Sequence, residues 1–130
     1  MTTIKAYTDL EQSRKLAEIL PLESADMYYH NRVDIPDNFP LPIEWKRANP
    51  LLSQEIPCWS LAALLGLIPQ EIFDGEYIIN ITEGCDYRWA LTYDYYENSK
   101  LSYYGLSAGA DNLIDACYEL TLRLHERKML

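Results

Sequence analysis

Apolar residues recur at helical spacing in three stretches, which predict helices at residues 9–20, 58–66 and 111–127. The first begins at a predicted capping box, with Thr8 as N-cap and Glu11 three residues later. The second is apolar on every side except Ser60, which predicts a helix in the middle of the core. The third is expected to be capped by Asp111, and its core face carries Leu113, Ala116, Cys117, Leu120 and Leu124.

Residues 76–106 alternate with a period of two instead, which predicts a β-meander. The clearest strand is Tyr87 to Asp94, with Tyr87, Trp89, Leu91 and Tyr93 on one face. Shorter strands are expected at residues 26–30 and, at a sheet edge, at 43–46. The prolines between residues 31 and 57 predict an extended arm. The pattern predicts an α+β fold, with a three- to five-stranded antiparallel sheet and about three helices packed mainly on one face.

Composition narrows the class of protein. The 130 residues suit one domain, 1–130, with its own core. A net charge of −9 argues against direct binding to nucleic acid or to an anionic membrane. The three cysteines do not form a disulfide framework, and no signal peptide is visible, so we expect a cytoplasmic protein with reduced thiols.

Tyrosine is unusually frequent, with 11 tyrosines against 2 phenylalanines. Tyrosine suits both half-buried sheet faces and interfaces with other proteins. If the aromatic residues form a binding surface, it lies on the arm and the meander, at Phe39, Trp45, Tyr95, Tyr96, Tyr103 and Tyr104. A platform for a sugar or a peptide is a weaker interpretation of the same residues.

Cys58 is the strongest candidate for catalysis, because a thiol at a helix start is stabilised as a thiolate. Gln54 before the Cys58-Trp59 pair resembles papain-like cysteine proteases, although the spacing differs. A cysteine nucleophile also needs a histidine, and the sequence offers only His30 and His125. The alternative is a structural Cys58, because free cysteine usually packs as a small hydrophobe.

No cofactor or metal site is expected. The histidines and cysteines show no ligand pair at metal-binding spacing. No glycine-rich phosphate motif occurs in the chain. Tyr118, Leu122 and His125 form a second flank of the last predicted helix, which suggests either a homodimer contact or packing under the arm.

Three segments, residues 20–27, 57–65 and 115–120, resemble a family of small uncharacterised proteins from gut anaerobic bacteria and their phages or mobile elements. The resemblance implies a mobile-element setting and carries over no catalytic residue. The leading hypothesis is a non-enzymatic module that binds another protein or regulates it. The alternatives are a cysteine-dependent hydrolase using Cys58 and a sugar- or peptide-binding domain.

Overall fold

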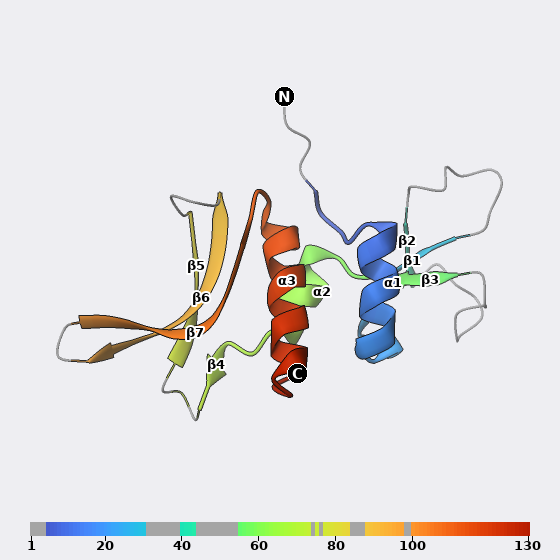
Figure 1. Ribbon diagram of the computed structural model, residues 1–130. Coiled ribbons are helices and arrows are strands. Elements are labelled where there is room, and N and C mark those ends of the chain that lie inside the picture. Colours follow the sequence, from blue (N-terminus) through green and yellow to red (C-terminus); the bar gives the residue numbers. More distant parts are fainter. Residues whose placement is uncertain are drawn as a thin grey trace.

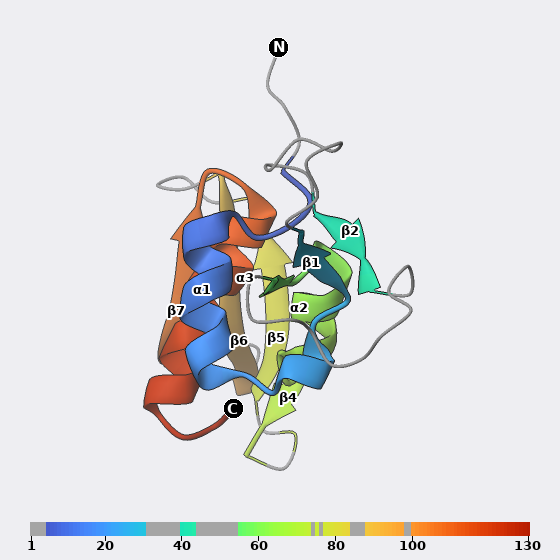
Figure 2. The same ribbon diagram turned by 90° about the vertical axis from the view of Figure 1, so that its right-hand side faces the viewer.

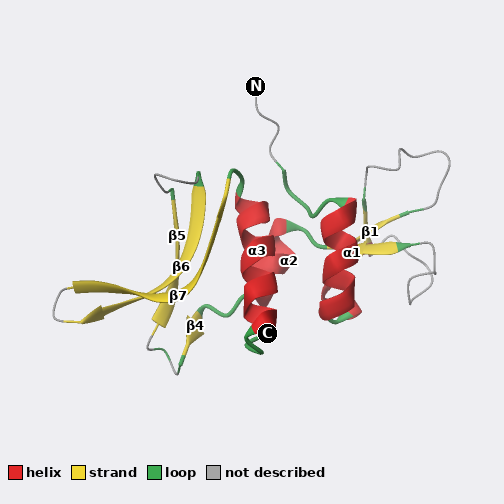
Figure 3. Ribbon diagram, viewed as in Figure 1, coloured by secondary structure: helices red, strands yellow, loops and turns green. Residues whose placement is uncertain are grey.

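The computed structural model describes residues 5–30, 40–43, 55–73, 75, 77–83, 88–97 and 100–130, and within these it describes no side chains for 95–97 and 100–105. Figure 3 shows helices and strands along these parts of the chain. Their order is α1 (Leu10–Ile19), the short 3-10 helix η1 (Leu22–Ser24), β1 (Met27–Tyr29), β2 (Leu41–Pro42), β3 (Ile56–Cys58), α2 (Leu61–Leu67), β4 (Glu71–Ile72), β5 (Tyr77–Thr82), β6 (Trp89–Glu97), β7 (Lys100–Ala110) and α3 (Leu113–Glu126).

The predicted α+β class and the antiparallel meander are confirmed, but the strands form two sheets. The larger sheet has the order β4-β5-β6-β7, and the smaller has the order β2-β1-β3. Strand β2 ends at Pro42, and Ile43 after it is not part of a strand. The rest of the edge strand expected at 43–46 lies outside the described residues. Strand β7 runs on to Ala110, past the expected end of the meander at residue 106. Its register with β6 shifts between Thr92 and Asp94, which marks an irregularity in the hairpin.

The elements stack in a row of layers (Figure 1). The four-stranded sheet lies on one side, α3 and α2 cover one of its faces, α1 follows, and the three-stranded sheet is outermost. Helix α3 packs on β7 and β6, and α1 packs on β3. Of the three helices expected mainly on one face of the sheet, α3 and α2 cover one face of the larger sheet, whereas α1 lies between α3 and the smaller sheet.

One buried cluster joins the larger sheet with the three helices. Its fully buried side chains include Leu16, Trp59, Leu64, Leu91, Tyr93 and Leu120. The predicted alternation in β6 is confirmed for Leu91 and Tyr93, which are both fully buried. The hydroxyl of Tyr93 donates to the carbonyl oxygen of Pro69 at 2.6 Å, and burial raises the pKa of Tyr93 to about 12.

Two helix caps lie one residue after their predicted positions. Helix α1 is capped by Asp9, and its capping box is completed by Gln12 and not by Glu11. Thr8 is fully buried, and its hydroxyl accepts the backbone N–H of Trp59, so Thr8 contacts the strand region and is not the cap. Helix α3 is capped by Asn112 and not by Asp111.

Helix α2 differs most from its prediction. It begins after Ser60, whose hydroxyl accepts the N–H of Ala63 at 3.2 Å, so the helix expected at 58–66 starts at Leu61. Asp26 accepts a hydrogen bond from the backbone N–H of Ser60 at 2.9 Å and holds this turn in place. Leu64 is the one fully buried residue among those of α2. The expectation of a helix in the middle of the core, covered on more than one side, is therefore wrong: α2 buries one face and leaves the other near water.

No helix in the described parts of the chain is long and apolar enough to span a bilayer.

Candidate functional site

Cys58, the candidate nucleophile, is the last residue of strand β3 and does not begin a helix. The chain is extended there because Cys58 and Pro57 pair with Met27 and Tyr28 of β1. Pro57 is tolerated because β3 is an edge strand, where a missing N–H can face outward. The helix dipole that was expected to favour a Cys58 thiolate is therefore absent from this position.

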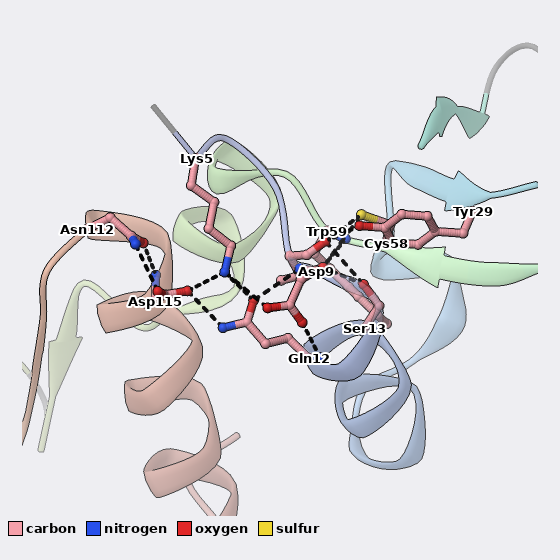
Figure 4. Close-up of polar contacts among 10 residues, drawn as sticks. Lys5, Asp9, Gln12, Ser13, Tyr29, Cys58, Trp59, Asn112 and Asp115 are labelled. Atoms are coloured by element: carbon pink, nitrogen blue, oxygen red, sulfur yellow. Dashed lines mark hydrogen bonds and ion pairs between the residues drawn. The ribbon is translucent and has the colours of Figure 1, made fainter. Parts of the chain in front are cut away.

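The thiol of Cys58 is fully buried among hydroxyl groups (Figure 4). Its sulfur lies 3.5 Å from Thr8 Oγ1 and 3.4 Å from the carbonyl oxygen of Thr8. The hydroxyl of Tyr29 donates to the same carbonyl oxygen at 2.8 Å. Burial raises the pKa of Cys58, and the hydrogen bonds from Thr8 and Ser13 lower it only in part. Burial likewise raises the pKa of Tyr29, so both groups are held protonated near neutral pH.

In the described contacts, the partners of the Cys58 thiol are Thr8, Ser13 and Tyr29, and neither histidine is among them. Successive side chains of a strand point to opposite faces, so Cys58 shares a face with its partner Met27 and with Tyr29. His30 is buried and directly follows Tyr29, beyond the end of β1 and of its pairing with β3. His125 is exposed in the last turn of α3, with Nδ1 3.3 Å from the carbonyl oxygen of Leu130.

The other described thiol, Cys117, is fully buried in α3, and burial raises its pKa to about 12. Among the described residues, no group of three histidine, cysteine or acidic side chains could hold a metal ion. Cys85 lies outside the described residues.

A second polar cluster joins the N-terminal ends of α1 and α3 (Figure 4). Lys5 Nζ lies 2.6 Å from Asp115 Oδ1, and Gln12 donates to the same oxygen at 2.8 Å. Asn112 donates to the other Asp115 oxygen at 2.8 Å. Burial by itself would raise the pKa of Asp115, but the hydrogen bonds from Lys5, Gln12 and Asn112 outweigh it and hold the pKa below its usual value. Each of these polar side chains has a hydrogen-bond partner within the cluster, so we interpret the cluster as a structural link between α1 and α3.

The predicted aromatic surface falls largely beyond what the structure describes. Phe39 and Trp45 lie outside the described residues. Tyr95 and Tyr96 belong to β6, and Tyr103 and Tyr104 belong to β7. In the backbone register, Tyr103 pairs with Asp94, where the two strands extend away from the helices (Figure 1). Their side chains are outside the described part of the chain, so this surface remains a prediction.

The flank expected to form a homodimer is partly covered within the chain. Tyr118 and Leu122 are half-buried and pack against the core, whereas His125 is exposed. Burial raises the pKa of Tyr118, and the nearby carboxylates of Glu119, Asp9 and Glu11 raise it further. The last two carboxylates belong to the start of α1, so this flank lies beside α1. A dimer contact there remains a prediction.

The structure also reveals a candidate site that the sequence pattern did not single out. Strand β5 presents Ile78 and Ile81 to solvent, with 57% and 42% of their surface exposed. Beside them is a cavity of about 390 Å³ between β5 and α2. Its lining, called here the β5 edge surface, is Leu65, Ile68, Gln70, Ile78, Ile79 and Ile81. Figure 2 shows α2 next to β5, with β4 beyond the end of the pair.

Strand β4 is too short to cover β5. It pairs only with Tyr77 and Ile78, and the ladder ends where the N–H of Ile79 donates to the carbonyl oxygen of Gln70 at 2.9 Å. The sequence did hold a signal for this exposure. Ile78, Ile79 and Ile81 place apolar side chains on both faces of one strand, and a strand with a solvated face normally carries polar residues there.

No protein-family model, curated protein or solved structure matches this chain.

Proposed function

We propose that the protein is a non-enzymatic module that binds another protein, and that the β5 edge surface is its principal contact. The observation that carries this proposal is the exposure of Ile78 and Ile81 beside the apolar cavity. Contiguous apolar surface rimmed by polar residues is typical of interaction sites. In the setting implied by the resemblance to mobile-element proteins, the partner would be a protein of the host or of the element.

A partner that covers this surface removes apolar area from water. That removal is favourable by about 25 cal/mol per square ångström before the costs of association are subtracted. Ile78 and Ile81 stand on opposite faces of β5, since they lie an odd number of positions apart. A partner that wraps the edge of the strand can therefore cover both side chains, together with Leu65 and Ile68 of α2.

The alternative of a cysteine-dependent hydrolase has less support. Its premises were a thiolate at a helix start and a nearby histidine. Cys58 ends a strand, is fully buried and has a raised pKa, and its described contacts are with Thr8, Ser13 and Tyr29. A sugar- or peptide-binding platform would depend on Tyr95, Tyr96, Tyr103 and Tyr104, for which side chains are not described.

The proposal is tested by crosslinking in cells that carry the native gene, followed by rebinding of each recovered protein to purified variants. The variant I78K/I81K places charges on the β5 edge surface. Leu22→Lys is the matched control, because Leu22 is 51% exposed on η1 and lies outside this surface. All three positions are exposed, so each change should alter stability by less than about 0.5 kcal/mol.

We expect a recovered partner to bind the wild type and Leu22→Lys equally and to lose most of its affinity for I78K/I81K. Retained binding by I78K/I81K would remove this surface from the proposal. Recovery of no partner, together with turnover of a defined substrate by the pure protein, would overturn the proposal as a whole.

A further inference from the structure

Beyond the end of β4, the edge of β5 has no strand partner among the described residues, and it offers backbone hydrogen-bonding groups as well as apolar side chains. The N–H of Ile79 points away from β6 toward β4. In an antiparallel strand the backbone groups of alternate residues point the same way, so the N–H and C=O of Ile81 also point away from β6. The described hydrogen bonds outside the ladders include none to the backbone of Ile81. β5 therefore presents a short strand edge, from Asn80 to Thr82, beyond the end of β4.

The residues that flank this edge in sequence carry negative charges only. Glu71, paired with Ile78, and Glu83, directly after β5, are both exposed. From Ser60 to Tyr87 the sequence contains no lysine or arginine. The nearest basic residue on the neighbouring strand segment is Arg88, which precedes β6 and is one strand removed from the free edge. An apolar edge between two acidic ends is complementary to an apolar segment with basic ends.

From this edge and these charges we infer that the partner binds by strand addition, through an extended segment with alternating apolar residues and lysine or arginine at its ends. The segment continues the line of β4 along β5 and exchanges hydrogen bonds with the N–H and C=O of Ile81. Its apolar side chains cover Ile78 on one face of the sheet and enter the cavity beside Leu65 and Ile81 on the other. The inference rests on the proposed function and adds to it the mode of binding and the chemistry of the partner.

The acidic ends also argue against a second copy of this chain as the occupant. Pairing two β5 edges would bring Glu71 and Glu83 of both copies together, and each copy has a net charge of −9. Like charges that meet across an interface oppose association.

The test uses synthetic peptides as probes. The first alternates valine and threonine and has two lysines at each end. The second replaces the lysines with glutamates, and the third keeps the lysines but carries N-methyl groups on alternate backbone amides. We expect only the first to bind at low salt, and we expect its affinity to fall as sodium chloride screens the charges. Equal binding of the glutamate or N-methylated peptide would overturn the inference.

Two variants separate the contribution of the backbone hydrogen bonds to peptide binding from the contribution of the charges. Ile81→Pro removes the outward N–H and leaves the ladder with β6, because proline is tolerated at a strand edge. We expect it to weaken the lysine peptide about five- to tenfold, as expected for one lost hydrogen bond. Glu71→Gln and Glu83→Gln together should weaken it about threefold and reduce its salt dependence, whereas the control Glu18→Gln on α1 should not.

Hydrogen exchange gives a readout that is specific to strand addition. The amide of Ile81 should exchange more slowly when the lysine peptide is bound, while the amide of Ile79, already bonded to Gln70, should change little. Peptide binding without added protection of Ile81 would overturn strand addition. Protection of Ile81 in the free protein, with a doubled mass in light scattering, would identify a second copy as the occupant and also overturn the inference. If a cellular partner binds wild type and Ile81→Pro equally, the inference fails while the proposed function stands.

Discussion

At the scale of single residues, polar side chains lock together parts of the chain that are far apart in sequence. Thr8 contacts both Cys58 and the backbone of Trp59, and the indole N–H of Trp59 donates to Ser24 Oγ at 2.9 Å. These contacts satisfy polar groups inside a largely apolar region, which avoids the cost of burying them unpaired. The sequence showed Cys58 and its neighbours but not these partners, because each of them lies tens of residues away along the chain.

Thiol labelling should reveal how strongly burial suppresses cysteine reactivity. In a Cys85→Ala variant, Cys58 and Cys117 should resist iodoacetamide at neutral pH and react after unfolding in urea, because both are buried and have raised pKa values. Mass spectrometry of the labelled protein measures the modified fraction over time. Rapid labelling of Cys58 in the folded protein near pH 6–7 would instead support the hydrolase alternative.

Asp115 should make stability depend on pH. Its pKa is held below the usual value of 3.8, so its contribution is present above about pH 4 and is lost as pH falls through the lower pKa of the folded state. We expect Asp115→Asn to lower the free energy of unfolding by about 1–3 kcal/mol at neutral pH, and by less near pH 2.5. Urea titrations at the two pH values measure both costs. The matched control Asp111→Asn changes an exposed neighbour and should have little effect, and an equal cost at both pH values would contradict the argument.

At the scale of elements, the spacing of apolar residues predicted the helices and strands that bury one regular face. The core face of α3 is largely as expected, since Ala116, Cys117, Leu120 and Leu124 are all fully buried. Periodicity failed at residues 57–60, where an apolar run suits a helix as well as a strand. Residues 56–58 form a strand because they pair with β1, which is distant in sequence. The short β4 leaves β5 exposed for a similar reason, because the length of a strand pair depends on both partners.

The one-sided burial of α2 predicts a large difference between adjacent leucines. Leu64→Ala should lower the free energy of unfolding by about 2–5 kcal/mol, because it leaves a cavity at a fully buried position. Leu65→Ala should cost much less, since Leu65 is half-buried and lines the β5 edge surface. Urea denaturation of both variants measures the difference. Similar costs would mean that α2 is covered on more than one side, as the apolar sequence suggested.

At the scale of the whole molecule, one apolar cluster spans the larger sheet and all three helices and reaches Trp59, directly after β3. It includes Leu16 of α1, Leu64 of α2, Leu91 of β6 and Leu120 of α3, with Trp59 next to the smaller sheet. Sequence composition predicted a core of about this size within a single domain. The order of the layers depends on which faces of the helices and sheets pack together, and composition does not give those contacts. The separate three-stranded sheet could not be read from the sequence, since β2 and β3 supply only two and three residues to it.

The shared core predicts cooperative unfolding of the two sheets. Far-ultraviolet circular dichroism and tryptophan fluorescence should give the same midpoint in urea, because Trp59 and Leu91 belong to one packed cluster. A Trp45→Phe variant restricts the fluorescence to Trp59 and Trp89. An earlier fluorescence transition would reveal that the smaller sheet unfolds on its own.

The bond between Lys5 and Asp115 also has a consequence for the order of events during synthesis. The two residues are 110 positions apart, and their side chains meet at the start of both α1 and α3. Contacts between such distant positions close a long loop and form late in folding. On a ribosome, α1 can be made early but cannot gain this anchor until α3 has left the exit tunnel. Until then, the face of α1 that later packs toward α3 must remain exposed or be sheltered by a chaperone.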